Sequence, residues 1–121
     1  MNNFNSIEIK VFLPSKNFEI SKQFYLDLGF IKASDSDGIA YFYHDNCSFL
    51  LQDFYEENFA NNLMMHFLVE DISSWHKKFI ENDIENKYGV KITEIKKQPW
   101  NMLDFIIYDP SGVLWRFAQN I

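Results

Sequence analysis

Residues 18–30 of the chain read FEISKQFYLDLGF, and this stretch provides the first landmark of the fold. Its apolar residues recur at helical spacing and form one stripe: Phe18, Phe24, Tyr25 and Leu28. Gly29 follows where a residue in the left-handed conformation commonly ends a helix. Upstream, either Ser15 or Asn17 can act as the N-cap. The stretch therefore predicts a helix from Ser15 to Leu28.

The segments on either side of this helix have the patterns of strands and turns. Residues 7–13 (IEIKVFL) alternate, which predicts a strand that ends at Pro14. Ile7, Ile9, Val11 and Leu13 share one face of it, and Glu8, Lys10 and Phe12 share the other. Further strands are predicted over residues 30–34, 41–44 and 47–53, with Asp45-Asn46 as a hairpin turn. Residues 54–62 are polar and read as a linker with at most one helical turn.

The same order of elements then begins again. Residues 63–70 predict a strand, and Asp71 can cap a helix that ends near residues 82–83. Its apolar stripe is Ile72, Trp75, Phe79 and Ile80. Strands follow over residues 89–96, 102–108 and 113–119. Since neither half can bury both faces of its own sheet, the pattern predicts one α+β domain over residues 1–121. Its two βαβββ modules, about 5–54 and 63–121, would form a curved mixed sheet with helices on the outer face.

Composition excludes several classes of protein. The 121 residues are 47% hydrophobic and 18% aromatic, which is enough for a folded core. The net charge of −6 argues against nucleic-acid binding, because such binding depends on clustered basic residues. No apolar run approaches the length that spans a membrane. Cys47 is the only cysteine, so no internal disulfide can form, and we expect a reducing, cytoplasmic location.

Four short motifs in this order resemble the glyoxalase/bleomycin-resistance/dioxygenase group, also called the vicinal oxygen chelate superfamily. The motifs are Phe24-Tyr25-Leu26-Asp27-Leu28-Gly29-Phe30, Phe67-Leu68-Val69-Glu70-Asp71-Ile72, Gln98-Pro99-Trp100-Asn101-Met102 and Asp109-Pro110-Ser111-Gly112-Val113-Leu114. The last two are most similar to bleomycin-resistance relatives, and the likeness covers nearly the whole chain. The physical reading of the glycines and prolines in these motifs is turn formation.

The resemblance also implies where a metal would bind. Enzymes of this group hold a divalent metal on the first and last strands of each half, positions that correspond here to Glu8, Gln52, Met64 and Arg116. Met64 is a poor ligand for a hard cation, and the guanidinium of Arg116 has no lone pair to donate. We therefore expect no metal and no cofactor. His66 would become a ligand only if the register shifted by two residues.

Strand alternation predicts which side chains face a groove between the two halves. They are mainly aromatic and apolar with a few polar groups, as in small-molecule sites. The candidate ligand-binding residues are Glu8, Lys10, Phe12, Tyr41, Tyr43, Gln52, Met64, His66, Trp100, Phe105 and Arg116. The resemblance alone places Trp100 at the mouth of the groove, and it is otherwise a surface-loop ring. Glu8 and Arg116 either contact the ligand or pair with each other.

These observations favour a binding protein without catalytic residues. The resemblance implies a small-molecule ligand with aromatic or cationic groups, such as an antibiotic, and a homodimer with its grooves near the interface. No catalytic triad pattern, nucleotide-binding glycine loop or Cys-x-x-Cys motif is present. Two alternatives stay open: a metal-dependent lyase, isomerase or dioxygenase with rearranged ligands, and a regulatory ligand sensor or partner-binding module.

Overall fold

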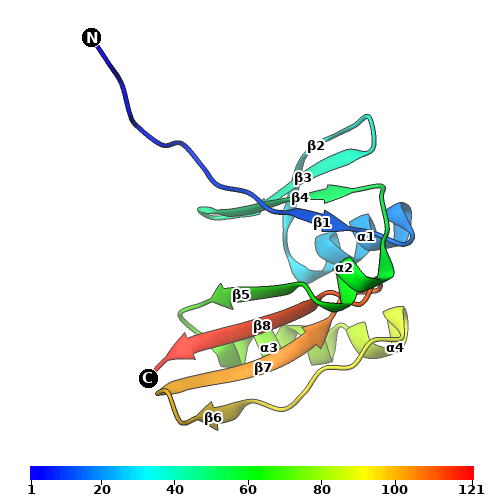
Figure 1. Ribbon diagram of the computed structural model, residues 1–121. Coiled ribbons are helices and arrows are strands. Elements are labelled where there is room, and N and C mark those ends of the chain that lie inside the picture. The colour runs from blue at the N-terminus through cyan, green and yellow to red at the C-terminus, as the bar shows by residue number, and fades with distance from the viewer.

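Each half of the chain folds into a four-stranded mixed sheet backed by a helix, as a computed structural model of residues 1–121 shows (Figure 1). The first half contains β1 (Phe12–Pro14), α1 (Phe18–Leu28), β2 (Ile31–Ser36), β3 (Ile39–His44) and β4 (Cys47–Gln52). Helix α2 (Glu57–Asn61) connects the halves. The second half contains β5 (Met64–Leu68), α3 (Ile72–Glu81), α4 (Ile84–Tyr88), β6 (Lys96–Gln98), β7 (Met102–Tyr108) and β8 (Leu114–Asn120).

The two sheets have the same topology, which confirms the predicted α+β class and the repeated order of elements. Their strand orders are β1-β4-β3-β2 and β5-β8-β7-β6. In each, the first strand runs parallel to the last, and the other neighbours are antiparallel. After the first strand, the chain crosses through a helix to the opposite edge of the sheet and returns strand by strand, so the last strand lies parallel to the first. No helix is long and apolar enough to cross a bilayer.

Helix α1 begins and ends where its capping residues require. Asn17, and not Ser15, is the N-cap, and its side-chain oxygen accepts a hydrogen bond from the Ile20 N–H at 3.2 Å. Gly29 ends the helix with φ of 112°, a conformation that strongly favours glycine. In the second half Asp71 caps α3 in the same way, by accepting from the Ser74 N–H.

The region between α3 and β7 differs from the prediction. Residues 89–96 were expected to form a strand, but only Ile92 makes an isolated bridge, to Ile107, before the short strand β6. The unpredicted helix α4 precedes them and ends at Gly89. A hydrogen bond from the Ile92 N–H to the Glu85 carboxylate, at 2.9 Å, ties this irregular segment to α4. Ile92 is therefore buried, and Val90 and Ile95 partly buried, without a continuous strand.

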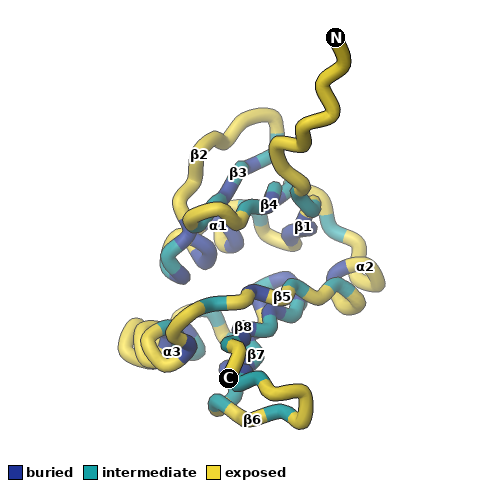
Figure 2. Tube along the Cα trace, turned by 90° about the vertical axis from the view of Figure 1, so that its left-hand side faces the viewer, coloured by how far each residue is buried: buried dark blue, intermediate teal, exposed yellow.

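The strand predicted over residues 7–13 is also mostly absent. Only β1 forms, and Ile7 and Ile9 are 100% and 95% exposed. The last backbone contact upstream is the Val11 carbonyl, which accepts from the Leu50 N–H at 2.9 Å. Residues 1–11 are here called the N-terminal arm, and its N-terminal end projects away from both sheets (Figures 1 and 2). The alternating pattern predicted an apolar face for the arm, and of its residues Val11 packs against the core while Ile7 and Ile9 stay uncovered.

An aromatic core joins the two halves. Phe30 and Phe49 of the first half pack on Trp115 of the second with ring centroids 5.4 Å apart in each pair. The Trp115 indole N–H donates to the Tyr25 hydroxyl at 2.9 Å, and that hydroxyl donates to Asp109 at 2.5 Å. Much of the aromatic content is therefore buried between the sheets and their helices, and it holds the halves together.

Candidate functional site

The face of each sheet that lies away from its helix is here called the groove face. On the first sheet, cross-strand pairs place Phe12, Tyr41 and Tyr43 on this face, together with Ser48, Leu50 and Gln52. The intervening residues, among them Phe42 and Phe49, are buried on the helix side. The predicted alternation of this sheet therefore agrees with the structure.

Glu8 reaches this face from the N-terminal arm. Its Oε1 accepts a hydrogen bond from the Lys10 ammonium at 2.6 Å, and its Oε2 accepts from the Tyr41 hydroxyl at 2.6 Å and from the Ser48 hydroxyl. The bonds from Lys10, Ser48 and Tyr41 lower the pKa of Glu8 to about 2. The carboxylate is therefore charged at neutral pH. The pairing of Glu8 with Arg116, one of the two predicted alternatives, does not form.

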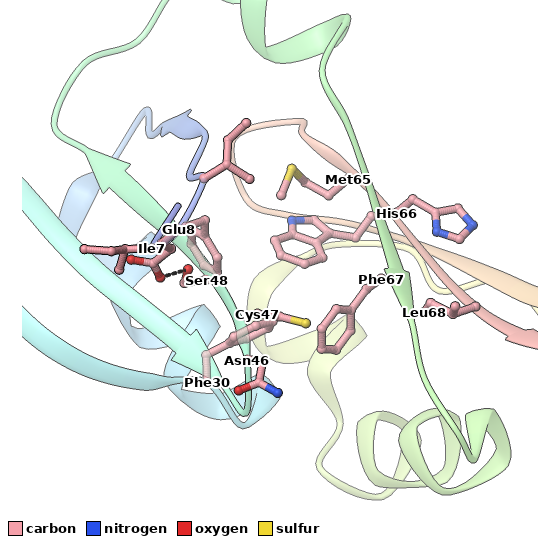
Figure 3. A pocket seen from close by; sticks show the side chains of 13 residues that line it. Ile7, Glu8, Phe30, Asn46, Cys47, Ser48, Met65, His66, Phe67 and Leu68 are labelled. Carbon is pink, nitrogen blue, oxygen red and sulfur yellow. Dashed lines mark hydrogen bonds between the residues drawn. The ribbon is translucent and has the colours of Figure 1, made fainter. Parts of the chain in front are cut away.

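Two cavities meet at Glu8 and Ser48. One, of about 610 Å³, lies over the groove face of the first sheet and is lined by Tyr41, Tyr43 and Asp45. The other, of about 430 Å³, lies between β4 and β5 (Figure 3). Its wall includes four rings of the inter-module core: Phe30, Phe49, Phe67 and Trp115. Figure 3 shows Met65 and Phe67 pointing into this crevice, while His66 and Leu68 point to the other side of β5.

The groove face of the second sheet contains a buried ion pair. Arg116 donates to the Asp104 carboxylate at 2.7 Å, and the Gln98 amide donates to its other oxygen at 2.9 Å. Asp104 is only 2% exposed, so the guanidinium and the amide compensate a charge that is costly to bury. These three side chains line a cavity of about 430 Å³ with Ile106 and Lys96. Arg116 is thus neutralised by its own chain.

Phe105 was placed on the wrong face. It pairs with Phe117, and the two rings stack at 5.2 Å inside the core, where Phe105 is 1% exposed. The groove-facing residues of β7 are its neighbours Asp104 and Ile106. A signal for this phase existed in the sequence. An aspartate inside the apolar run of residues 102–108 needs a cationic partner, and Arg116 lies on the adjoining strand.

The other sequence-predicted residues lie in different places. Met64 and His66 are exposed on the groove face of β5, and His66 is paired in register with Arg116. Gln52 lies at the end of β4, and its backbone carbonyl accepts from the Ser15 hydroxyl at 2.6 Å. Trp100 is 57% exposed in the turn between β6 and β7 and lines none of these three cavities. Within this chain, Trp100 therefore does not reach the groove at whose mouth it was predicted to lie.

The residues at the family's metal positions do not fit a metal. Both oxygens of Glu8 are engaged by Lys10, Tyr41 and Ser48. Arg116 supplies only donors, which leaves Gln52 and the Met64 thioether as a weak and chemically mixed pair. No group of three or more His, Cys, Asp or Glu side chains is placed to hold an ion anywhere in the chain.

Solved structures share this fold over nearly the full chain. A bleomycin-binding protein from the bleomycin producer Streptomyces verticillus, solved with copper(II)-bleomycin, is 20% identical with a TM-score of 0.78, covering 100% of both chains. The antibiotic-binding protein TnmS3 from Streptomyces sp. CB03234 is 19% identical with a TM-score of 0.78, covering 98% of this chain and 100% of that one. The bleomycin resistance determinant encoded on transposon Tn5 is 18% identical with a TM-score of 0.77, covering 95% and 98%.

The sequence itself also carries the family signal. No curated protein matches it. A family model does match, over residues 7–117, and this range includes strands of both sheets. The chain therefore belongs to the Glyoxalase/Bleomycin resistance protein/Dioxygenase superfamily.

Proposed function

We propose that this chain binds a small organic molecule with an aromatic or cationic group and does not transform it. The observation that carries this proposal is the wall of the 610 Å³ cavity, where Tyr41 and Tyr43 lie beside the charged Glu8. The two rings are 6.5 Å apart at an interplanar angle of 79°, so a planar guest that stacks on one ring meets the other edge to face. The carboxylate attracts positive charge, and the net charge of −6 acts in the same direction.

The similar structures suggest which ligand to test first. Bleomycin is the ligand named for the Streptomyces verticillus protein, and TnmS3 is described as antibiotic-binding. At 18–20% identity these likenesses carry the fold, so the ligand proposal depends on the groove residues of this chain. Because its metal positions are chemically mismatched, a binding role is better supported than metal-dependent catalysis.

A thermal-shift titration tests the proposal. Bleomycin and a set of aromatic cations should raise the melting temperature, because a ligand that binds only the folded chain stabilises it by roughly 2.7 kcal/mol at a hundred times Kd. The double variant Tyr41→Ala/Tyr43→Ala should lose the shift. Phe54→Ala, which removes an exposed ring outside both sheets, should keep it. Stoichiometric uptake of zinc, nickel, manganese or iron, without any shift by organic ligands, would instead favour the enzyme.

The proposal includes a homodimer. Ile7 and Ile9 of the N-terminal arm border the same crevice as Glu8, and they are almost fully exposed. A strand-like segment with one apolar face uncovered is unfavourable in water, and a second copy of the chain can cover it. The Glu8 side of the arm would still contact Tyr41 and Ser48, which places the contact between copies next to the groove.

The proposed place of action is the cytoplasm. Cys47 is exposed and unpaired, so the fold has no disulfide that an oxidising compartment would have to form. With 11 basic against 17 acidic residues, the chain also lacks the excess of positive charge that binding to nucleic acid needs.

A further inference from the structure

The Lys10 side chain occupies the place that a cationic ligand would take beside Glu8. Its ammonium lies 2.6 Å from Glu8 Oε1 and 5.1 Å from the centre of the Tyr41 ring. A carboxylate and the face of an aromatic ring are the two groups that proteins use to bind an organic ammonium. Glu8, Tyr41 and Ser48 therefore form a small site for a cation, and the chain fills it with its own lysine.

The rest of this cavity has no cation to balance its charge. The charged residues that line it are Glu8 and Asp45, both acidic. Lys10 is not part of the cavity wall, and its side chain reaches Glu8 from the N-terminal arm. Removal of the Lys10 ammonium would leave an acidic cavity with an exposed tyrosine face.

Lys10 can leave without disturbing the fold. Residues 1–10 make no backbone hydrogen bond to either sheet, and the first such bond is the one at Val11. The ammonium contacts nothing outside this cluster. Glu8 Oε2 would keep its bonds from Tyr41 and Ser48 when Oε1 exchanges Lys10 for another cation.

We propose that Lys10 is an intramolecular competitor, and that an organic ammonium binds beside Glu8 and Tyr41 by displacing it. The inference rests on the proposed function and deepens it, because it names the subsite and the residue that sets its selectivity. A ligand with a protonated amine next to an aromatic ring can replace both contacts of Lys10. A neutral aromatic ligand cannot, and it leaves the lysine in place.

The test compares Lys10→Gln with the wild type, using benzylammonium and its neutral analogue benzyl alcohol as probes. NMR chemical shifts of Tyr41 and Ser48 report binding at this subsite. Lys10→Gln should bind benzylammonium roughly threefold to tenfold more tightly, since one exposed ion pair and one cation–π contact no longer compete. Its affinity for benzyl alcohol should not change. Lys97→Gln is the matched control. It removes the same charge from an exposed lysine of β6 and should behave as the wild type.

Each other result overturns the inference. Equal affinities in Lys10→Gln and Lys97→Gln mean that Lys10 does not compete, and a weaker Lys10→Gln means that the lysine helps to bind the ligand. No shift of Tyr41 or Ser48 with benzylammonium means that the subsite does not take cations. The last result leaves the proposed function standing if bleomycin still raises the melting temperature through Tyr41 and Tyr43. Glu8→Gln should abolish benzylammonium binding and, as a variant of the exposed arm, should keep the wild-type circular dichroism spectrum.

Discussion

At the scale of single residues, two buried carboxylates stand out beside a core of aromatic and aliphatic side chains. Asp104 is held by Arg116 and Gln98, and Asp109 accepts from the Tyr25 hydroxyl and from the backbone N–H groups of Ser111 and Val113. No buried side-chain nitrogen or oxygen in the chain lacks a hydrogen-bond partner. Because every buried polar atom is hydrogen-bonded, two carboxylates can be buried in a small apolar core. Removal of any of their hydrogen-bond partners is correspondingly costly.

Tyr25→Phe should therefore destabilise the protein by about 1–3 kcal/mol, although it removes a single oxygen. The substitution leaves the Trp115 indole N–H without an acceptor and takes one donor from Asp109. Urea denaturation measures the loss. Tyr43→Phe removes a hydroxyl from a half-buried groove position and should change stability by less than about 0.5 kcal/mol. Equal losses in the two variants would contradict the role given to the buried network.

Asp109 should also make stability depend on pH. Burial raises its pKa to about 6 against the opposing effects of the Tyr25 hydroxyl and the backbone N–H groups. An acid whose pKa is higher in the folded state stabilises that state fully below its unfolded pKa, near 4, and this contribution disappears as pH rises through 6. The free energy of unfolding of the wild type minus that of Asp109→Asn should thus fall between pH 4 and pH 6, by on the order of 3 kcal/mol. A difference that rises over this interval would show a lowered pKa instead.

At the scale of elements, the sequence predicted those whose signals are local. Helix α1 carries its stripe, its N-cap and its terminal glycine in one continuous stretch, and the hairpin of β3 and β4 has its turn at Asp45-Asn46. Helix α4 has only five residues and no side-chain cap, so no pattern announces it. The N-terminal arm alternates as a strand does, but alternation cannot say which edge, or which chain, the strand will meet.

Gly29→Ala should test how far the end of α1 depends on its glycine. A residue with φ of 112° is strained when it has a Cβ, and that Cβ would lie 2.5 Å from the Lys78 amine. The lysine can move away, so backbone strain sets the cost, about 1–3 kcal/mol. Gly89→Ala is the matched control, because its φ of 64° lies in the ordinary left-handed region with nothing within 4 Å. Thermal unfolding should rank Gly29→Ala as the less stable, and the reverse order would contradict this explanation.

At the scale of the whole molecule, the candidate site depends on relations between distant segments. Glu8 comes from the arm, Tyr41 from β3 and Ser48 from β4, and the crevice beside them needs β5 of the other half. Strand alternation predicted which residues of the first sheet face the groove. It could not predict that Glu8 would meet Lys10 and not Arg116, because pairing across the groove depends on how the two halves pack.

The assembly prediction concerns the same arm. Light scattering after size exclusion should give the wild type twice the mass of one chain, and Ile7→Ser/Ile9→Ser should shift it to a single chain, because the uncovered apolar face is lost. Ile20→Ser is the control, since it removes an exposed isoleucine from α1 and should stay dimeric. A monomeric wild type would remove the dimer from the proposal. A monomeric double variant that still binds benzylammonium would show that each groove is complete within one chain.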